Sequence, residues 1–309
     1  MKGAIKMIEI KGLYKSFDGF QALHNLDLSV QKGSIYGLIG TNGAGKTTII
    51  KHLAGVLRQD KGEITYDNVP VWENEDVKQQ IGYIPDELYF QNGFTLFAMG
   101  KYYSRIYKNW NEDRFQKMVA VFNLNGRKKL RNFSKGMKKQ AAFSLVMSTM
   151  PAYLILDEPI DGLDPIVRKL VWQYIVEDVA ERELSVLVSS HNLREMEGIC
   201  DSIGVIAKGQ MKLQRDLDEL KNDMHKVQVA FGKNNPNPNP YEGLNVLHKE
   251  SRNSIDLLLI KDKREKVEEI IYKSNPILFD LLPLSLEEIF IHELGGDNNE
   301  ITEITKSIF

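Results

Sequence analysis

Eight residues, GTNGAGKT from Gly40 to Thr47, constrain the fold of this chain more than any others. They fit the pattern G-x-x-x-x-G-K-[ST], in which glycines let the backbone turn tightly and bring its N–H groups close to an anion. A short apolar stretch of strand character, residues 34–39, precedes them, and residues 48–56 have a helical apolar face. A helix that begins there adds the positive end of its dipole. Strand, loop and helix together predict a binding site for a nucleoside triphosphate.

Side chains within this loop have separate expected tasks. Lys46 can reach the outer phosphates as a point charge, and the hydroxyl of Thr47 can bind a magnesium ion. The expected nucleotide-binding residues of the loop are Gly40, Thr41, Asn42, Gly43, Ala44, Gly45, Lys46, Thr47 and Thr48.

Bulk composition excludes several classes of protein. A formal net charge of -2 over 309 residues argues against binding nucleic acid through bulk positive charge, so we expect no nucleic-acid partner. The single cysteine, Cys200, cannot form an internal disulfide, which favours a reducing compartment. Because no run of 18 apolar residues occurs, we expect the chain not to span a membrane itself.

The segment before the loop predicts an antiparallel β subdomain. Residues 5–13 and 21–30 alternate apolar and polar side chains, and Asp18-Gly19 between them is a hairpin signal. Phe17 lies at this turn. Its ring could stack on a nucleotide base, or it could pack on its own hairpin, and the sequence leaves both interpretations open.

Residues 91–150 read as a helical subdomain inserted into an α/β core. They follow a short apolar strand, 81–85, which ends in Asp86-Glu87. Three stretches show the 3.6-residue spacing of helices: 95–107, 111–122 and 135–150. One helix face cannot bury all the aromatic residues of this region, so we expect at least one of Tyr89, Phe90 and Phe94 to be exposed.

Two further apolar strands end in polar residues that suit phosphate chemistry. Residues 153–156 run into Asp157-Glu158, where the first acid would lie next to magnesium and the second would point at the attacking water. Both could instead be solvated turn residues. The strand over 184–189 leads to His191, which could reach the γ-phosphate or could be structural. A helix over 192–200 and a strand over 202–207 are expected next.

From about residue 223 the pattern changes to a small α+β appendage. Short strands are expected at 226–231, 255–260 and 277–281, with a helix at 263–273 and a final helix at 284–294. The expected fold class is therefore α/β: a phosphate-loop NTPase core with an antiparallel β subdomain, an inserted helical subdomain (about 90–150) and the appendage. We expect the domains to cover residues 5–222 and 223–309.

Taken together, residues 7–215 resemble the nucleotide-binding subunit of ATP-binding cassette (ABC) transporters, with that family's motifs in that family's order. GTNGAGKT is similar to the Walker A motif, and YLILDE, which ends in Asp157-Glu158, is similar to Walker B. FSKGMKKQ is similar to the signature motif and keeps Ser134 and Gly136, but it has Lys135 and Met137 where the family has Gly and Gln.

Other positions extend the resemblance. GLDP, which contains Asp164, is similar to the D-loop, and His191 and Phe17 occupy the positions of the switch histidine and of the aromatic residue that stacks on adenine. At the Q-loop position, Asp86 replaces the family's Gln.

The resemblance implies an ATPase that requires Mg²⁺. Glu158, His191 and Lys46 would be catalytic, and Thr47, Asp86 and Asp157 would hold the metal. Phe17, Ser134, Gly136 and Asp164 would join the loop residues in binding ATP, with Ser134 and Gly136 acting across a dimer. The implied partners are polytopic membrane subunits and a second nucleotide-binding subunit, either another copy or a paralogue. The expected location is the cytoplasmic side of the cell membrane, as a peripheral subunit.

The S-K-G-M signature and the appendage resemble the exporter branch that includes drug, sodium and lantibiotic-type systems. Two alternatives remain from the sequence: an ABC-type ATPase that acts on a non-membrane partner, and a regulatory module that binds ATP without hydrolysing it.

Overall fold

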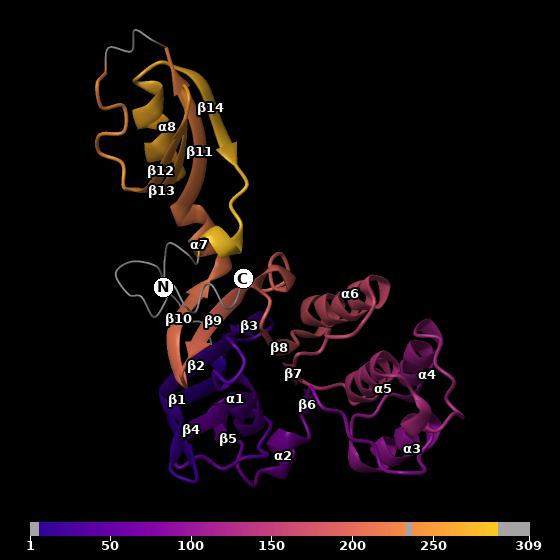
Figure 1. Cartoon of the computed structure of the whole chain (residues 1–309). Helices are drawn as coiled ribbons and strands as arrows, with labels where there is room; N and C mark the ends of the chain where they lie inside the picture. The colour runs from indigo at the N-terminus through magenta and orange to yellow at the C-terminus, as the bar shows by residue number, and fades with distance from the viewer. Residues whose placement is uncertain (1–5, 233–236, 290–309) are drawn as a thin grey trace. The chain divides into compact units, whose positions relative to one another are not determined.

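The computed structural model describes residues 6–232 and 237–289, and the chain divides into two compact units, Met1–Gln214 and Arg215–Phe309 (Figure 1). The boundary expected between functional domains, at residue 222, stays a prediction. Among the described residues, no helix is both long enough and apolar enough to cross a bilayer.

A six-stranded sheet positions the phosphate loop in the first unit. Its strand order is β10-β9-β3-β8-β7-β6, and the pairs β9–β3, β3–β8, β8–β7 and β7–β6 are all parallel. Parallel strands end at the same edge of a sheet, so the residues that follow these strands gather there. The strands are β3 (Ile35–Ile39), β6 (Ile81–Ile84), β7 (Tyr153–Asp157), β8 (Ser185–Ser190), β9 (Ser202–Ala207) and β10 (Gln210–Asp216).

An antiparallel sheet of order β2-β1-β4-β5 packs into the same hydrophobic core. The predicted hairpin is confirmed, because Asp18 and Gly19 form the turn between β1 and β2 with φ values of 47° and 84°. The core joins both sheets to the helix after the phosphate loop through side chains such as Ile10, Leu26, Tyr36 and Ile49. The strands are β1 (Lys6–Phe17), β2 (Phe20–Gln31), β4 (Lys61–Tyr66) and β5 (Val69–Pro70).

Helices fill the segment between β6 and β7, as the sequence predicts, and lie together beside the sheets in Figure 1. Thr95, Asn111 and Ser134 cap three of them, each accepting a hydrogen bond from the N–H three residues further on. The helices of this unit are α1 (Lys46–Leu53), α2 (Glu75–Lys78), α3 (Leu96–Ile106), α4 (Glu112–Val121), η1 (Leu130–Asn132), α5 (Lys135–Met147), α6 (Pro165–Arg182) and η2 (Leu193–Glu195).

The helix expected over residues 192–200 is wrong. Only Leu193–Glu195 are helical, as a single 3₁₀ turn, and turns follow. Asn192 accepts a hydrogen bond from Arg194 N–H, two residues on, which tightens this turn. Gly198 has φ of 82°, a left-handed conformation that an α-helix cannot continue through.

The second unit is a four-stranded antiparallel sheet of order β12-β13-β11-β14, whose core includes residues of one helix, α8. Its core is built from Val227, Val229, Leu258, Ile260 and Val267 with Ile271. The elements are α7 (Leu217–Asp223), β11 (Met224–Phe231), β12 (Val246–Arg252), β13 (Ile255–Lys261), α8 (Arg264–Tyr272) and β14 (Pro276–Leu282).

Strand β12 was not predicted, because its sequence VLHKESR is mostly polar and lies at the edge of the sheet. Of the helix expected at 284–294, residues 286–289 are helical, and the part from residue 290 lies outside the described residues. Residues 233–236 also lie outside the described residues.

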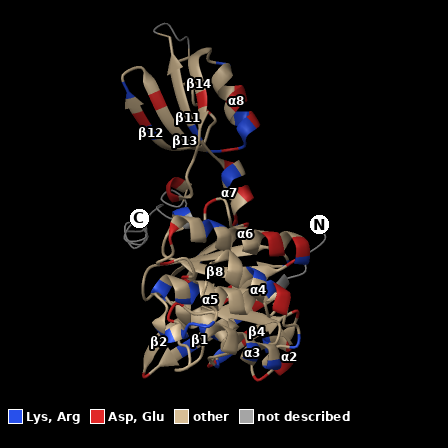
Figure 2. Ribbon diagram, turned by 90° about the vertical axis from the view of Figure 1, so that its right-hand side faces the viewer, with Lys and Arg blue, Asp and Glu red and all other residues tan. Residues whose placement is uncertain are grey.

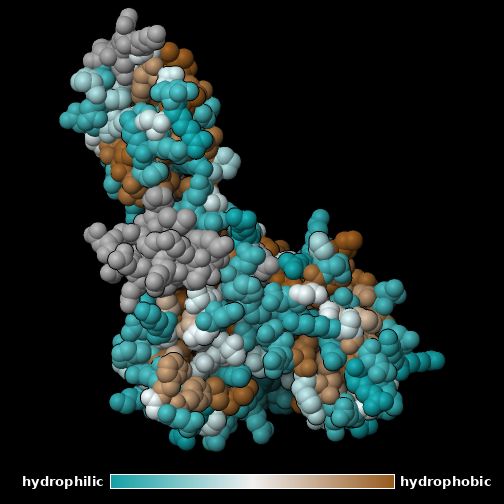
Figure 3. Space-filling view, viewed as in Figure 1, coloured by the Kyte–Doolittle hydropathy of each residue, from teal (hydrophilic) through white to brown (hydrophobic). Residues whose placement is uncertain are grey.

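Positions of basic and acidic residues are interspersed along the ribbon in Figure 2, and hydrophilic residues predominate on the face seen in Figure 3. At least one of Tyr89, Phe90 and Phe94 was expected to be exposed. Tyr89 confirms this with an exposed fraction of 86%, whereas Phe90 and Phe94 are half-buried.

Candidate functional site

The phosphate loop begins where β3 ends and closes into α1. Gly40 is required by space, because a Cβ there would lie 2.5 Å from the carbonyl oxygen of Ile206 on β9. Gly45 caps α1 with φ of 112°, a conformation that disfavours any residue with a side chain. Ala44 N–H donates to the Thr41 carbonyl at 3.1 Å. These constraints fix a tight loop at the N-terminus of a helix, which is a favourable place for an anion.

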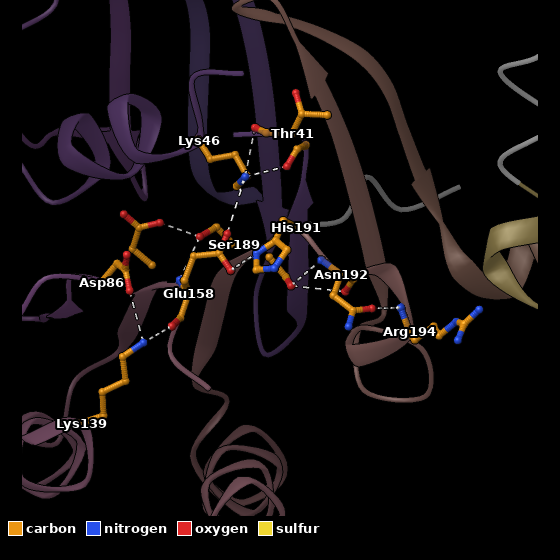
Figure 4. A network of polar contacts seen from close by, with 12 residues as sticks. Thr41, Lys46, Asp86, Lys139, Glu158, Ser189, His191, Asn192 and Arg194 are labelled. Carbon is orange, nitrogen blue, oxygen red and sulfur yellow. Dashed lines mark hydrogen bonds and ion pairs between the residues drawn. The ribbon is translucent and has the colours of Figure 1, made fainter. Parts of the chain in front are cut away.

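Lys46 turns its ammonium into this loop. Its side chain is buried, and Nζ donates to the carbonyls of Gly40 at 2.6 Å and Thr41 at 3.2 Å. The carboxylate Oε1 of Glu158 lies 3.6 Å from the same Nζ. A cation from the start of α1 and an acid from the end of β7 therefore meet beside the loop (Figure 4).

A cavity of about 350 Å³ opens against the loop. Ten of the residues predicted for the site line it, and two others, Phe20 and Ala22, were missed. The lining residues are Phe17, Phe20, Ala22, Thr41, Asn42, Gly43, Gly45, Lys46, Thr47, Thr48, Asp86 and Glu158.

Two exposed aromatic rings contribute to this cavity. Phe17 and Phe20 are paired across the hairpin turn, with exposed fractions of 41% and 70%. Exposed rings can stack on a planar ligand, and neither Phe17 nor Phe20 belongs to the buried core. The symmetrical sequence Phe-Asp-Gly-Phe around the turn is the signal that could have identified Phe20.

The two acids at the end of β7 are placed differently. Asp157 is buried and accepts a hydrogen bond from Ser189 Oγ at 2.7 Å. The side chain of Glu158 turns toward the cavity, and its Oε2 lies 3.0 Å from Nδ1 of His191, which follows β8. His191 is itself half-exposed and does not line the cavity.

Burial raises the pKa of the Glu158 carboxyl above its ordinary value, and the nearby Lys46 and His191 offset only part of this effect. A carboxylate with a raised pKa that faces a cavity is a common feature of general bases. The position of Glu158 between a lysine and a histidine therefore suits proton transfer or the orientation of a water molecule.

Ser189 and Lys139 hold this acid pair and were not predicted. Besides its bond to Asp157, Ser189 Oγ accepts the N–H of Glu158 at 3.1 Å. Lys139 on α5 donates to the Glu158 carbonyl at 2.6 Å and to Asp86 Oδ1 at 3.3 Å. Ser189 is a small residue within an apolar strand. Lys139 lies in the segment FSKGMKKQ, but the resemblance gave roles there only to Ser134 and Gly136, so neither Ser189 nor Lys139 was singled out from the sequence.

Oxygen ligands for a divalent cation are available near the cavity. Thr47 and Asp86 line it, and Asp157 lies at the adjoining strand end. Ligand atoms of Glu158, Asp161 and His191 also lie within 4.8 Å of one another. Hydroxyl and carboxylate oxygens are the ligands that Mg²⁺ prefers.

Three of the predicted residues lie away from the cavity. Ser134 accepts the N–H of Met137 as the cap of α5, and Asp164 accepts two N–H groups as the cap of α6. A Cβ on Gly136 would lie 3.2 Å from the carbonyl of Gly162. The segments that contain Gly136 and Gly162 are therefore neighbours, but neither contributes to the wall of the cavity beside Lys46.

Comparison with known proteins gives consistent matches. A family model described as "ABC transporter" matches residues 23–161. The "ABC transporter ATP-binding protein YtrB" of Bacillus subtilis (strain 168) is 33% identical over 290 residues, which cover 94% of this chain and 99% of that protein. The "Lantibiotic transport ATP-binding protein SrtF" of Streptococcus pyogenes is 32% identical over 238 residues, which cover 74% of this chain and 99% of that protein.

A solved structure described as "Structure of ATP binding subunit of ABC transporter" has 27% sequence identity to this chain. Its TM-score is 0.65, and the match covers 70% of this chain and 92% of the other. This likeness confirms the predicted α/β fold class.

We expect Ser189→Ala to lower the free energy of unfolding of the first unit by about 1–3 kcal/mol, because Asp157 would stay buried without its hydroxyl donor. Urea unfolding followed by tryptophan fluorescence measures this, since all three tryptophans, at 72, 110 and 172, lie in that unit. Ser104→Ala is the control, because Ser104 is exposed and should change stability by less than about 0.5 kcal/mol. Equal stabilities for the two variants would contradict the role given to Ser189.

Proposed function

The chain belongs to the ABC transporter family of ATP-binding proteins, and on this premise we propose that it binds and hydrolyses ATP to power transport by separate membrane-spanning subunits. One observation carries the proposal. Lys46 at the start of α1, Glu158 after β7 and His191 after β8 come together beside the phosphate loop. In phosphoryl transfer to water, a cation stabilises the charge on the phosphate and an acid orients or deprotonates the water. Lys46 and Glu158 suit these two tasks, and His191 is paired with Glu158.

In this proposal the loop and the aromatic rings bind the nucleotide. The backbone N–H groups of residues 40–48 and the ammonium of Lys46 receive the phosphates, and Phe17 stacks on the base. Phe20 lines the same cavity and is a second candidate for that contact. Thr47, Asp86 and Asp157 would hold Mg²⁺, which when bound neutralises phosphate charge and orients the terminal phosphate.

Glu158 acts on the water. Its ionised carboxylate accepts a hydrogen bond from the water that attacks the γ-phosphate in line, and His191 stabilises both this carboxylate and the charge that develops on phosphate. The pairing of Glu158 with His191 favours an ATPase over a regulatory module that binds ATP without hydrolysis. We also favour membrane subunits over a non-membrane partner, because the relative that matches 94% of this chain is a transporter protein by name.

We propose that Ser134, Gly136 and Asp164 serve the nucleotide held by a second subunit. None of these three residues lines the cavity beside Lys46 of their own chain, which supports this proposal. The segments that contain Gly136 and Gly162 are neighbours of each other. The second subunit is another copy or a paralogue. Together with the membrane subunits, it would keep the chain at the cytoplasmic face of the cell membrane as a peripheral component, which co-purification with a polytopic partner tests.

The direction that we propose is export. The name of the Streptococcus pyogenes relative, a lantibiotic transport protein, and the S-K-G-M signature support this branch. Accumulation of cargo inside inverted membrane vesicles on addition of ATP is the expected sign of export, and accumulation in right-side-out cells would contradict it.

We expect Glu158→Gln to slow ATP hydrolysis at least about a hundredfold while ATP affinity stays within a few fold, because the amide cannot accept the proton of water. Because burial raises the pKa of Glu158, the acid limb of the kcat profile should lie above the range of an ordinary Glu. Turnover should be lost as the pH falls through this raised pKa. The residual turnover of Glu158→Gln should not show this acid limb, because glutamine does not titrate. An exposed acid of α6 provides the control, Glu177→Gln, which should retain wild-type turnover. A Glu158→Gln rate near that of the control would rule out the assignment.

The shared site is tested by mixing two inactive chains with different tags. In a head-to-tail homodimer of one Lys46→Ala chain and one Ser134→Arg chain, both defects fall in one composite site and the other site is intact. We expect the isolated mixed dimer to recover part of the turnover that each variant lacks alone. Proven mixed dimers without any recovery would argue for hydrolysis within one chain or for strict coupling of two sites.

A further inference from the structure

Lys139 is a buried lysine close to the candidate site. It lies on α5, five residues after Ser134, and only 3% of its side chain is exposed. Lysine is almost never fully buried unless its charge is paired, because transfer of an ammonium out of water is costly. The preceding residue, Lys138, is half-buried, and both lysines line a groove together with Lys135 and Asp86. The burial of the Lys139 ammonium therefore requires an explanation, whereas the half-buried Lys138 does not.

The ammonium of Lys139 joins three separate segments of the chain (Figure 4). It donates to the backbone carbonyl of Glu158 at 2.6 Å and lies 3.3 Å from Oδ1 of Asp86. Asp86 follows β6, Glu158 follows β7, and Lys139 belongs to the helical segment between these strands. The side chain of Asp86 is 43% exposed, so water also solvates this carboxylate. The carbonyl of Glu158 is therefore the closer of the two partners.

The backbone of Glu158 needs such a partner. Its φ of 46° lies in the left-handed region, which costs a residue with a side chain of order 1–3 kcal/mol and persists only when surrounding contacts hold it. Ser189 accepts its N–H, and Lys139 donates to its carbonyl. The peptide groups on both sides of the Glu158 Cα are therefore fixed. Their orientation determines where the side chain points, which is toward Lys46 and His191.

We propose that Lys139 is a positioning residue for Glu158 and that Asp86 is the counter-ion which keeps the ammonium of Lys139 in place. This inference rests on the role proposed for Glu158 in hydrolysis. Lys139 touches neither the cavity beside Lys46 nor the nucleotide in this account. It acts by holding the strained peptide of Glu158, so its loss should lower turnover without weakening ATP binding.

Lys139→Met tests this in the full-length chain, because methionine fills the buried space without the charge. Turnover with MgATP should fall about ten- to a hundredfold, which is the usual cost of a small displacement of a reacting group, while the Kd for ATP stays within about twofold. Lys138→Met is the matched control, since it removes the same charge from the adjacent residue of the same helix, and it should retain wild-type turnover. Wild-type turnover in Lys139→Met, or a parallel loss of ATP affinity, would overturn the proposal.

A second variant covers the case in which the single change prevents folding. In Lys139→Gln no buried ammonium remains and Asp86 stays available as the proposed Mg²⁺ ligand, so the chain should fold. The amide nitrogen lies one bond nearer the backbone than Nζ and should not hold the Glu158 carbonyl as Lys139 does, so turnover should still fall. Wild-type turnover in Lys139→Gln would overturn the proposal.

Combination with Glu158→Gln separates positioning from a general structural effect. If Lys139 acts through the carboxylate of Glu158, adding Lys139→Met to Glu158→Gln should change the residual single-turnover rate by less than about twofold. An equal fold-change in both backgrounds would show that Lys139 acts independently of Glu158 and would overturn the inference. Failure of the underlying function is distinguishable, because Glu158→Gln alone would then keep its wild-type rate.

Discussion

The buried ammonium of Lys46 is the charge on which the rest of the site depends. A cation enclosed by protein is stable only with close acceptors, and here these are two carbonyls of its own loop and the carboxylate of Glu158. The loop can surround Lys46 because Gly40 lies against β9 without a side chain and Gly45 adopts a left-handed conformation. The parallel sheet then brings Asp86, Glu158 and His191 to the same edge. The order of its strands thus determines which acids can face the phosphates.

Much of this arrangement could be predicted from the sequence, because continuous apolar strands that end in polar residues place those residues at one sheet edge. The Asp157-Glu158 pair and His191 were predicted in this way. The phosphate loop was predicted from its glycine pattern, and the hairpin that carries Phe17 from alternating strands around Asp18-Gly19. The helical segment was equally clear, since capping residues such as Thr95 and Asn111 precede regular 3.6-residue spacing.

What could not be predicted depends on tertiary contacts. Nothing in the run Lys138-Lys139 distinguishes the half-buried lysine from the buried one, because their difference arises only when α5 packs against the end of β7. Ser189 reads as one more small residue in a strand, and its two hydrogen bonds join neighbouring strands. The helix expected over 192–200 does not form, because Gly198 adopts a left-handed conformation that an α-helix cannot continue through. The edge strand β12 gave no alternation to recognise.

The central claim is that the loop around Lys46 binds the phosphates of ATP, and titration calorimetry of the full-length chain with ATP tests it most directly. The account predicts saturable binding by the wild-type chain and affinity at least about tenfold weaker for Lys46→Ala, because the enclosed phosphate charge loses its cation. Equal affinity of the two chains for ATP would contradict the assignment of the site.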